Sequence, residues 1–122
     1  MGSRSDVTLV VKRDMFASMW KEIPEAMKTV TEYTEDMLQK DGSFLLNWLD
    51  VKWYEEYPGC GAVMKFIENY QDESSYYFVR TGEALDDNEE HGQFYDNPFE
   101  VCIRRHIEIL KDGEEVDLAV FT

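Results

Sequence analysis

A stripe of mostly apolar side chains at helical spacing constrains the fold of this chain more than any other feature. Members recur every three or four residues, at Phe16, Trp20, Ile23, Met27, Val30, Thr34 and Met37. This period predicts a long amphipathic helix, N-capped by Asp14, that packs against a core. Pro24 either kinks the helix or breaks it and starts a second one in its first turn. Gly42 is predicted to cap the end of the helical segment.

Other segments predict strands, because they are rich in β-branched and aromatic residues or alternate apolar with polar ones. These segments are residues 6–13, 43–57, 74–82, 99–110 and 116–122. A second helix is predicted over residues 60–70, where Val63, Phe66, Ile67 and Tyr70 share one face. The Asp112-Gly113 dipeptide predicts a hairpin that joins the strand at 99–110 to the C-terminal strand.

This order of elements predicts an α+β fold, with an antiparallel sheet that carries two or three helices on one face. A ferredoxin-like βαββαβ arrangement, or a variant of it, is the nearest common architecture. The predicted elements depart from this arrangement, because the second helix follows a single strand. A tight hairpin at Asn47 would divide the segment at residues 43–57 into two strands and restore the βαββαβ order. The 122 residues fit a single domain over residues 6–122, and residues 1–5 (MGSRS) read as a vector remnant.

The charge balance restricts the class of partner. The chain has 26 acidic and 12 basic residues, a net charge of −14. Such a surface repels nucleic acid and anionic membranes, and it attracts basic protein surfaces. The alternative is that the charge serves only solubility. No apolar run approaches the roughly 18 residues of a membrane helix, and no signal-peptide core is present, so we expect a cytoplasmic protein. Cys60 and Cys102 are expected to be buried free thiols.

The segment GEALDDNEEHGQFYDNPFE, residues 82–100, contains seven carboxylates and no Lys or Arg. Carboxylates mixed with aromatic rings can match a basic protein groove in charge and in apolar contact. We therefore predict a partner-binding surface made of Glu83, Asp86, Asp87, Glu89, Glu90, Phe94, Tyr95 and Asp96. The alternative is a solvated connection between two strands. Acidic residues along the predicted helix, such as Glu22, Glu25 and Glu32, can imitate the phosphates of nucleic acid.

Metal binding and catalysis find little support in the residue spacing. An EF-hand with Gly92 at its sixth position would need a Glu where Pro98 stands, and the Cys and His residues lack zinc-site spacing. We therefore expect no metal and no cofactor. The nucleophile, zinc and phosphate-loop motifs of common enzymes are absent, and Cys60 would need the fold to bring it to His106. An enzyme with a ligand or metal in a cleft between helices and sheet is an alternative.

The basic cluster at residues 104–106 (Arg-Arg-His), with Arg80 nearby, is the feature that speaks for nucleic-acid binding. The net charge opposes that function, so we expect these arginines to pair with carboxylates of the protein itself. Arg105 shares a face with isoleucines and is expected to form a buried or partly buried salt bridge.

The segment YYFVRTGEALDDNEEHG, residues 76–92, resembles segments of small uncharacterised phage and mobile-element proteins. The resemblance implies a phage accessory protein that inhibits host machinery, in some cases as a nucleic-acid mimic. With the charge, it favours a non-enzymatic acidic protein that engages a basic, nucleic-acid-binding surface of a host protein. A homo-oligomer that pairs through the aromatic face of its sheet is a further alternative.

Overall fold

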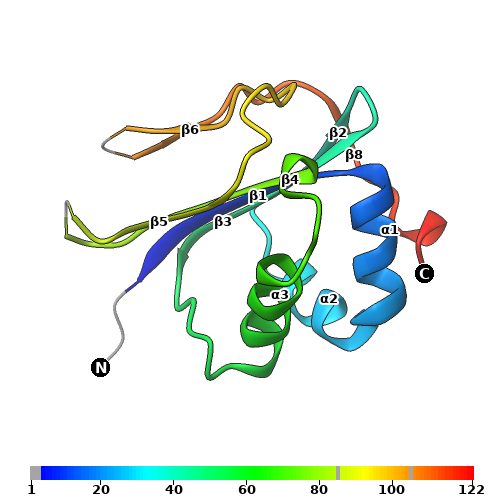
Figure 1. Cartoon of the computed structure of the whole chain (residues 1–122), viewed down its shortest axis with the longest axis horizontal. Helices are drawn as coiled ribbons and strands as arrows, with labels where there is room; N and C mark the ends of the chain where they lie inside the picture. Colours follow the sequence, from blue (N-terminus) through cyan, green and yellow to red (C-terminus); the bar gives the residue numbers. More distant parts are fainter. Residues whose placement is uncertain (1–3, 85, 105) are drawn as a thin grey trace.

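Three helices lie on one face of a six-stranded antiparallel sheet in the computed structural model of the chain (Figure 1), which confirms the predicted α+β class. The structure describes residues 4–84, 86–104 and 106–122. The helices are α1 (Arg13–Glu22), α2 (Pro24–Thr31) and α3 (Pro58–Glu68), with short 3-10 turns η1 (Glu73–Ser75) and η2 (Leu118–Val120). The strands are β1 (Ser5–Lys12), β2 (Asp36–Lys40), β3 (Ser43–Val51), β4 (Tyr76–Thr81), β5 (Asn88–Gly92), β6 (Cys102–Ile103), β7 (Ile107–Glu108) and β8 (Glu114–Glu115). No helix in these ranges is long and apolar enough to cross a bilayer.

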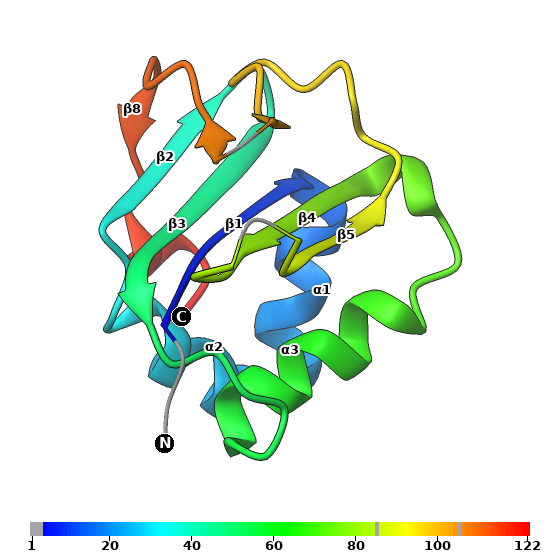
Figure 2. The ribbon, with the colours of Figure 1, turned by 90° about the vertical axis from the view of Figure 1, so that its left-hand side faces the viewer.

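The sheet has the strand order β5-β4-β1-β3-β2-β8, so β5 and β8 form its two edges (Figure 2). At its centre, Leu9 of β1 lies between Leu46 of β3 and Phe78 of β4. With α1 and α2 counted together, the elements from β1 to β4 follow a βαββαβ order, to which β5, β8 and a separate β6–β7 hairpin are added. That the chain is a variant of the ferredoxin-like fold stays a prediction.

Pro24 breaks the predicted long helix in two. Helix α1 ends at Glu22, Ile23 leaves helical geometry with φ −131° and ψ 56°, and Pro24 begins α2. Proline suits this position, because the first turn of a helix needs no bond from its missing N–H. The Ile23 carbonyl still accepts from the Met27 backbone N–H at 3.0 Å, so both helices keep the apolar stripe on one side.

The prediction that the helix continues to Met37 is wrong. Helix α2 ends at Thr31, and Met37 lies in β2 opposite Leu46. Threonine side chains compete for the carbonyls at this helix end: the Thr31 hydroxyl donates to the Met27 carbonyl at 2.7 Å, and the Thr34 hydroxyl donates to the Thr31 carbonyl at 2.9 Å. Because the helix ends at Thr31, residues 36–40 are free to form β2, which pairs with β3.

Gly42 does not cap a helix, as the sequence had predicted, but closes the hairpin between β2 and β3. Asp41 and Gly42 both have positive φ, at 51° and 75°, as a two-residue hairpin turn requires. The alternative of a tight hairpin at Asn47 is not what the structure shows, because β3 runs unbroken from Ser43 to Val51. The Asn47 side chain is buried inside the sheet, where it accepts a bond from the Thr8 hydroxyl at 2.9 Å.

The predicted strand at residues 99–110 is wrong as well: this segment forms the short β6–β7 hairpin, and β8 pairs with β2. Asn97 causes the change of direction, because its amide donates to the Phe94 carbonyl and its oxygen accepts from the Val101 backbone N–H. Glu100 follows with φ 51°. The predicted salt bridge of Arg105 lies outside the described residues.

The sheet is buried on both faces by two separate apolar clusters. On one side, Leu9, Phe44 and Phe78 pack against the helices. On the other side, Val10 and Leu45 pack beneath Phe99, which comes from the segment leading to the β6–β7 hairpin (Figure 1). Because alternate residues of β1 face the two clusters, this strand reads as a continuous apolar run.

Candidate functional site

The acidic segment belongs to a β-hairpin at one edge of the sheet. Its middle part forms β5, which pairs with β4 and is the first strand in the sheet order. The prediction of a loop through this segment therefore misses a strand. At Gly92 (φ 87°) a Cβ would lie 2.2 Å from the Tyr76 carbonyl oxygen, so only glycine lets the chain leave β5 here.

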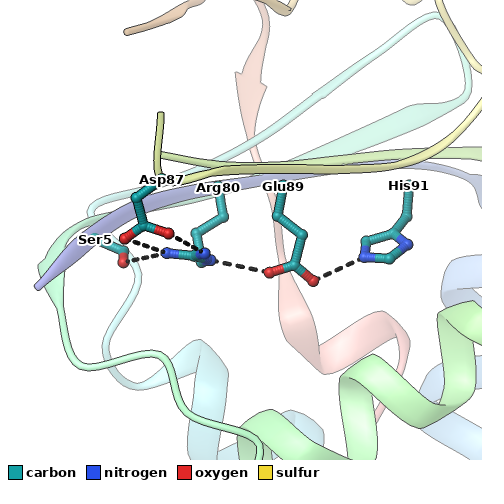
Figure 3. A network of polar contacts seen from close by, with 5 residues as sticks. All are labelled: Ser5, Arg80, Asp87, Glu89 and His91. Carbon is teal, nitrogen blue, oxygen red and sulfur yellow. Dashed lines mark hydrogen bonds and ion pairs between the residues drawn. The ribbon is translucent and has the colours of Figure 1, made fainter. Parts of the chain in front are cut away.

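Arg80 of β4 organises the hairpin from within (Figure 3). Its guanidinium donates to Asp87 at 2.8 Å, to Glu89 at 3.0 Å and to the Ser5 hydroxyl at 3.0 Å. The second oxygen of Glu89 lies 2.8 Å from Nε2 of His91. These side chains lie on the helix-facing side of the sheet, and the Arg80 side chain is only 17% exposed. We call these five residues the Arg80 cluster.

The Arg80 cluster keeps two of the predicted partner-binding carboxylates ionised and pairs them internally. Hydrogen bonding from Arg80 holds the pKa of Asp87 below its usual value. Burial raises the pKa of Glu89, but the bonds from His91 and Arg80 outweigh burial and leave that pKa lowered. Much of the charge of Asp87 and Glu89 is therefore compensated by Arg80.

Other members of the predicted set point in different directions. Glu90 accepts a bond from the Tyr77 hydroxyl at 2.6 Å, and burial followed by this bond raises the pKa of Tyr77. Phe94 is buried and lies 5.1 Å beneath the ammonium of Lys12. Glu83 accepts from the Arg4 backbone N–H at 3.0 Å. The remaining three residues, Asp86, Tyr95 and Asp96, are exposed. The predicted residues therefore do not form one continuous surface.

A hollow of about 330 Å³ lies beside β5 and gathers carboxylates that are distant in the sequence. Glu68 reaches it from the end of α3, Glu73 from η1 and Glu90 from β5, and none of the described Lys and Arg residues lines it. The other side chains that line it are Tyr76, His91, Gln93 and Tyr95. Burial, then the charges of Glu73 and Glu68, raise the pKa of the Tyr76 hydroxyl, which places that hydroxyl within their field. We call this site the acidic hollow.

Sequence reasoning found Glu90 and Tyr95 of the acidic hollow but missed Glu68 and Glu73. Both stand at the ends of predicted elements, where a charged residue usually faces water. Only the pairing of β4 with β5, which sets Phe78 opposite His91, brings these glutamates to the acidic segment. A hairpin turn predicted between residues 81 and 88 would have indicated that the acidic segment folds back along β4 toward Glu68 and Glu73.

The carboxylates of the acidic hollow are not arranged as an ion cage. Across residues 4–84, 86–104 and 106–122, no group of three or more His, Cys, Asp or Glu side chains is placed to hold a metal ion. The Cys60–His106 pair is not formed either, because α3 and the β6–β7 hairpin lie on opposite faces of the sheet (Figure 1). Both cysteines are free thiols, as predicted, but they are half-buried rather than buried.

Comparison of the chain with family models, with curated proteins and with solved structures found no match. The chemistry of the acidic hollow and its neighbouring strand edge is therefore the basis for a functional proposal.

Proposed function

We propose that this chain is a non-enzymatic binding protein, and that it captures a basic segment of a partner protein at the acidic hollow. The observation that carries the proposal is that Glu68, Glu73 and Glu90, from three different elements, line one hollow beside an edge strand of the sheet.

The shape of the acidic hollow favours a basic side chain over a bare ion. Its carboxylates stand too far apart to coordinate one metal, but a Lys or Arg side chain is long enough to lie among them. Tyr95, which is 65% exposed, adds ring surface, which attracts an ammonium or guanidinium group. A partner cation can therefore find both charge and an aromatic wall in the same place.

The edge of β5 supplies a second way to hold the partner. Only β4 pairs with β5 in the described part of the chain, so an extended segment can add to its outer edge through main-chain hydrogen bonds. The strand is short and carries Glu89, Glu90 and His91, which discourages pairing with a second copy of itself. The carboxylates of β5 would attract a basic segment of a partner, whereas they would repel the same carboxylates of a second copy of the chain.

The net charge of −14 extends the reach of this site, because it steers basic surfaces toward the protein. We propose a basic, nucleic-acid-binding surface of a host protein as the partner, and a phage-encoded inhibitor that acts in the cytoplasm as the biological role. The charge and the acidic hollow support the chemistry of the partner, and the resemblance of residues 76–92 to phage accessory proteins supports the role.

The test is the binding of a fluorescently labelled peptide of alternating Lys and Val residues, measured by anisotropy at several salt concentrations. In the double variant Glu68→Gln/Glu73→Gln we expect affinity to fall about tenfold, because two charges that face the bound cation are lost. The control Glu22→Gln/Glu32→Gln removes the same charge from two exposed positions, the last residue of α1 and the residue after α2, and should change affinity less than about twofold.

Equal losses in the two double variants would show that the peptide senses only total charge, and the acidic hollow would not be its site. Absence of peptide binding at low salt would contradict the proposal altogether. A pull-down from host lysate, eluted with high salt, then identifies the natural partner of a site that the peptide has located.

A further inference from the structure

A second hollow, of about 590 Å³, lies on the helix side of the sheet and shares no lining residue with the acidic hollow. It opens between α2, α3 and the segment that follows β3. Its principal walls are Val30, Tyr33, Trp48, Trp53, Tyr57 and Cys60. We call it the aromatic hollow. Its volume and its aromatic lining are those of small-molecule sites, which are mostly apolar and carry few polar groups.

The walls of the aromatic hollow are held in place before any ligand arrives. The Trp48 indole donates to the Val30 carbonyl at 2.8 Å, and its ring centroid lies 4.9 Å from that of Trp53. Gly59 lets α3 approach α2 closely, since a Cβ there would lie 3.2 Å from a Thr29 methyl. Rigid walls spare a ligand the cost of ordering them.

The backbone turns sharply at the rim of the aromatic hollow. Asp50 has φ 54°, a conformation that L-residues rarely adopt, and its backbone N–H donates to the Asp6 carboxylate at 2.9 Å. Asp50 lies in the register shift between the Trp48–Val7 and Val51–Ser5 pairs, and beyond Val51 the chain leaves β3 and runs along the hollow to Tyr57 and α3. The opening is thus set by held backbone rather than by side chains alone.

The charge at this rim differs from that of the rest of the surface. Arg4 and Lys52 line the aromatic hollow together with one carboxylate, that of Asp50. Four other hollows on the described surface have more carboxylates than Lys and Arg side chains in their lining. Arg4 belongs to the predicted vector remnant, and without it the rim is neutral. In either case an anion meets less repulsion here than at those four hollows.

We propose that the aromatic hollow binds a small planar aromatic molecule that carries one anionic group, a carboxylate or a sulfonate. The ring system would lie against the exposed rings of Tyr33 and Tyr57, next to the buried Trp48 and Trp53, and the anion would face Lys52 at the rim. This ligand site is independent of the proposed capture of a basic partner.

The probe is anilinonaphthalene sulfonate, an aromatic anion whose fluorescence rises in apolar sites. We expect it to bind with one-to-one stoichiometry and to receive energy transfer from tryptophan. Tyr33→Ala should weaken binding about fivefold, because it removes one wall of the hollow. Val120→Ala is the control, since Tyr33 and Val120 are 68% and 71% exposed, and it should leave affinity unchanged.

Charge variants test the anionic part of the proposal. Lys52→Glu should weaken binding about tenfold, whereas Lys21→Glu, the same charge change on the exposed side of α1, should change it less than about twofold. The uncharged analogue N-phenylnaphthylamine should bind more weakly than the sulfonate. Equal binding of the two probes, or equal effects of the two lysine variants, would overturn the preference for an anion.

The thiol of Cys60 reports the position of the probe. In the variant Cys102→Ser, Cys60 is the only cysteine of the chain, and bound probe should slow its reaction with a chromogenic disulfide reagent at least about fivefold. Unchanged labelling, or the absence of any binding by the folded protein, would overturn the site. Light scattering that shows a dimer dissociated by the probe would assign the hollow to a second copy of the chain instead.

Discussion

Replacement of Arg80 by methionine tests whether the Arg80 cluster holds the β4–β5 hairpin. The change keeps most of the side-chain length and removes the donors to Asp87, Glu89 and the Ser5 hydroxyl. Each hydrogen bond to a charged group is worth about 1.5–3 kcal/mol when water is excluded. Water recovers part of this energy, since the side chains of Asp87 and Glu89 are 39% and 34% exposed. We expect a loss of about 2.5 kcal/mol in the free energy of unfolding at neutral pH.

That loss converts into a readily measured change in melting temperature. A chain of 122 residues has an unfolding entropy of about 0.26 kcal/mol per kelvin, so the melting temperature should fall by about 10 °C. Urea titration followed by circular dichroism gives the free energy, and calorimetry gives the melting temperature. Arg104→Met is the matched control: its side chain is 74% exposed and lies 3.7 Å from Glu108, so it should cost less than about 0.5 kcal/mol.

The same variant should show a defined pH dependence. Arg80 lowers the pKa values of Asp87 and Glu89 in the folded state from ordinary values of 3.8 and 4.5. A carboxyl group with a lowered pKa contributes stability above its ordinary pKa and loses that contribution as the pH falls through the folded-state value. The stability gap between wild type and Arg80→Met should therefore be full at pH 7 and shrink below about pH 4. A gap below about 1 kcal/mol at neutral pH, or a gap independent of pH, would refute the assigned role.

Three further changes test local features of the fold by urea denaturation. Thr8→Val should cost about 1–3 kcal/mol, because it leaves the buried Asn47 oxygen without its donor; a neutral result would mean that water reaches that oxygen. Gly92→Ala should cost more than about 2 kcal/mol, since its Cβ would meet the Tyr76 carbonyl; a tolerated alanine would mean that the end of β5 shifts freely. Asp41→Ala should cost about 1 kcal/mol at its φ of 51°, and a stabilised hairpin would contradict the assigned turn.

The sequence predicted the fold class because its strongest patterns reflect burial. The stripe from Phe16 to Val30 lies against the sheet, and the helix at residues 60–70 is found as α3. The stripe misleads beyond Thr31, because Met37 is in phase with a helix and also faces the helix-side core from β2. Because Met37 fits both the helical and the strand period, its position in the sequence does not distinguish a helix from a strand. The β2–β3 hairpin, which turns at Asp41, places Met37 in a strand.

The site was less predictable, because it depends on register. The acidic segment and its hollow form only when β4 sets Arg80 opposite Glu89 and Phe78 opposite His91. Charge counting finds carboxylates but does not show which of them an internal arginine compensates. The prediction for residues 99–110 was wrong for a related reason. Alternating apolar and polar residues indicate an extended chain, but they do not distinguish one long strand from two short strands joined by a turn.

The two apolar clusters pack on opposite faces of the same sheet. We expect the cluster on the helix side to be more stable against local unfolding than the cluster on the far side. The segment that carries Phe94, Phe99 and Val101 closes only the cluster on the far side of the sheet from the helices. We therefore expect the segment that carries Phe94, Phe99 and Val101 to open at a lower free energy than the helix-side cluster of Leu9, Phe16 and Phe44. Hydrogen exchange should divide accordingly, with fast amides at the β6–β7 hairpin and with β1, enclosed between two neighbours, among the last to exchange.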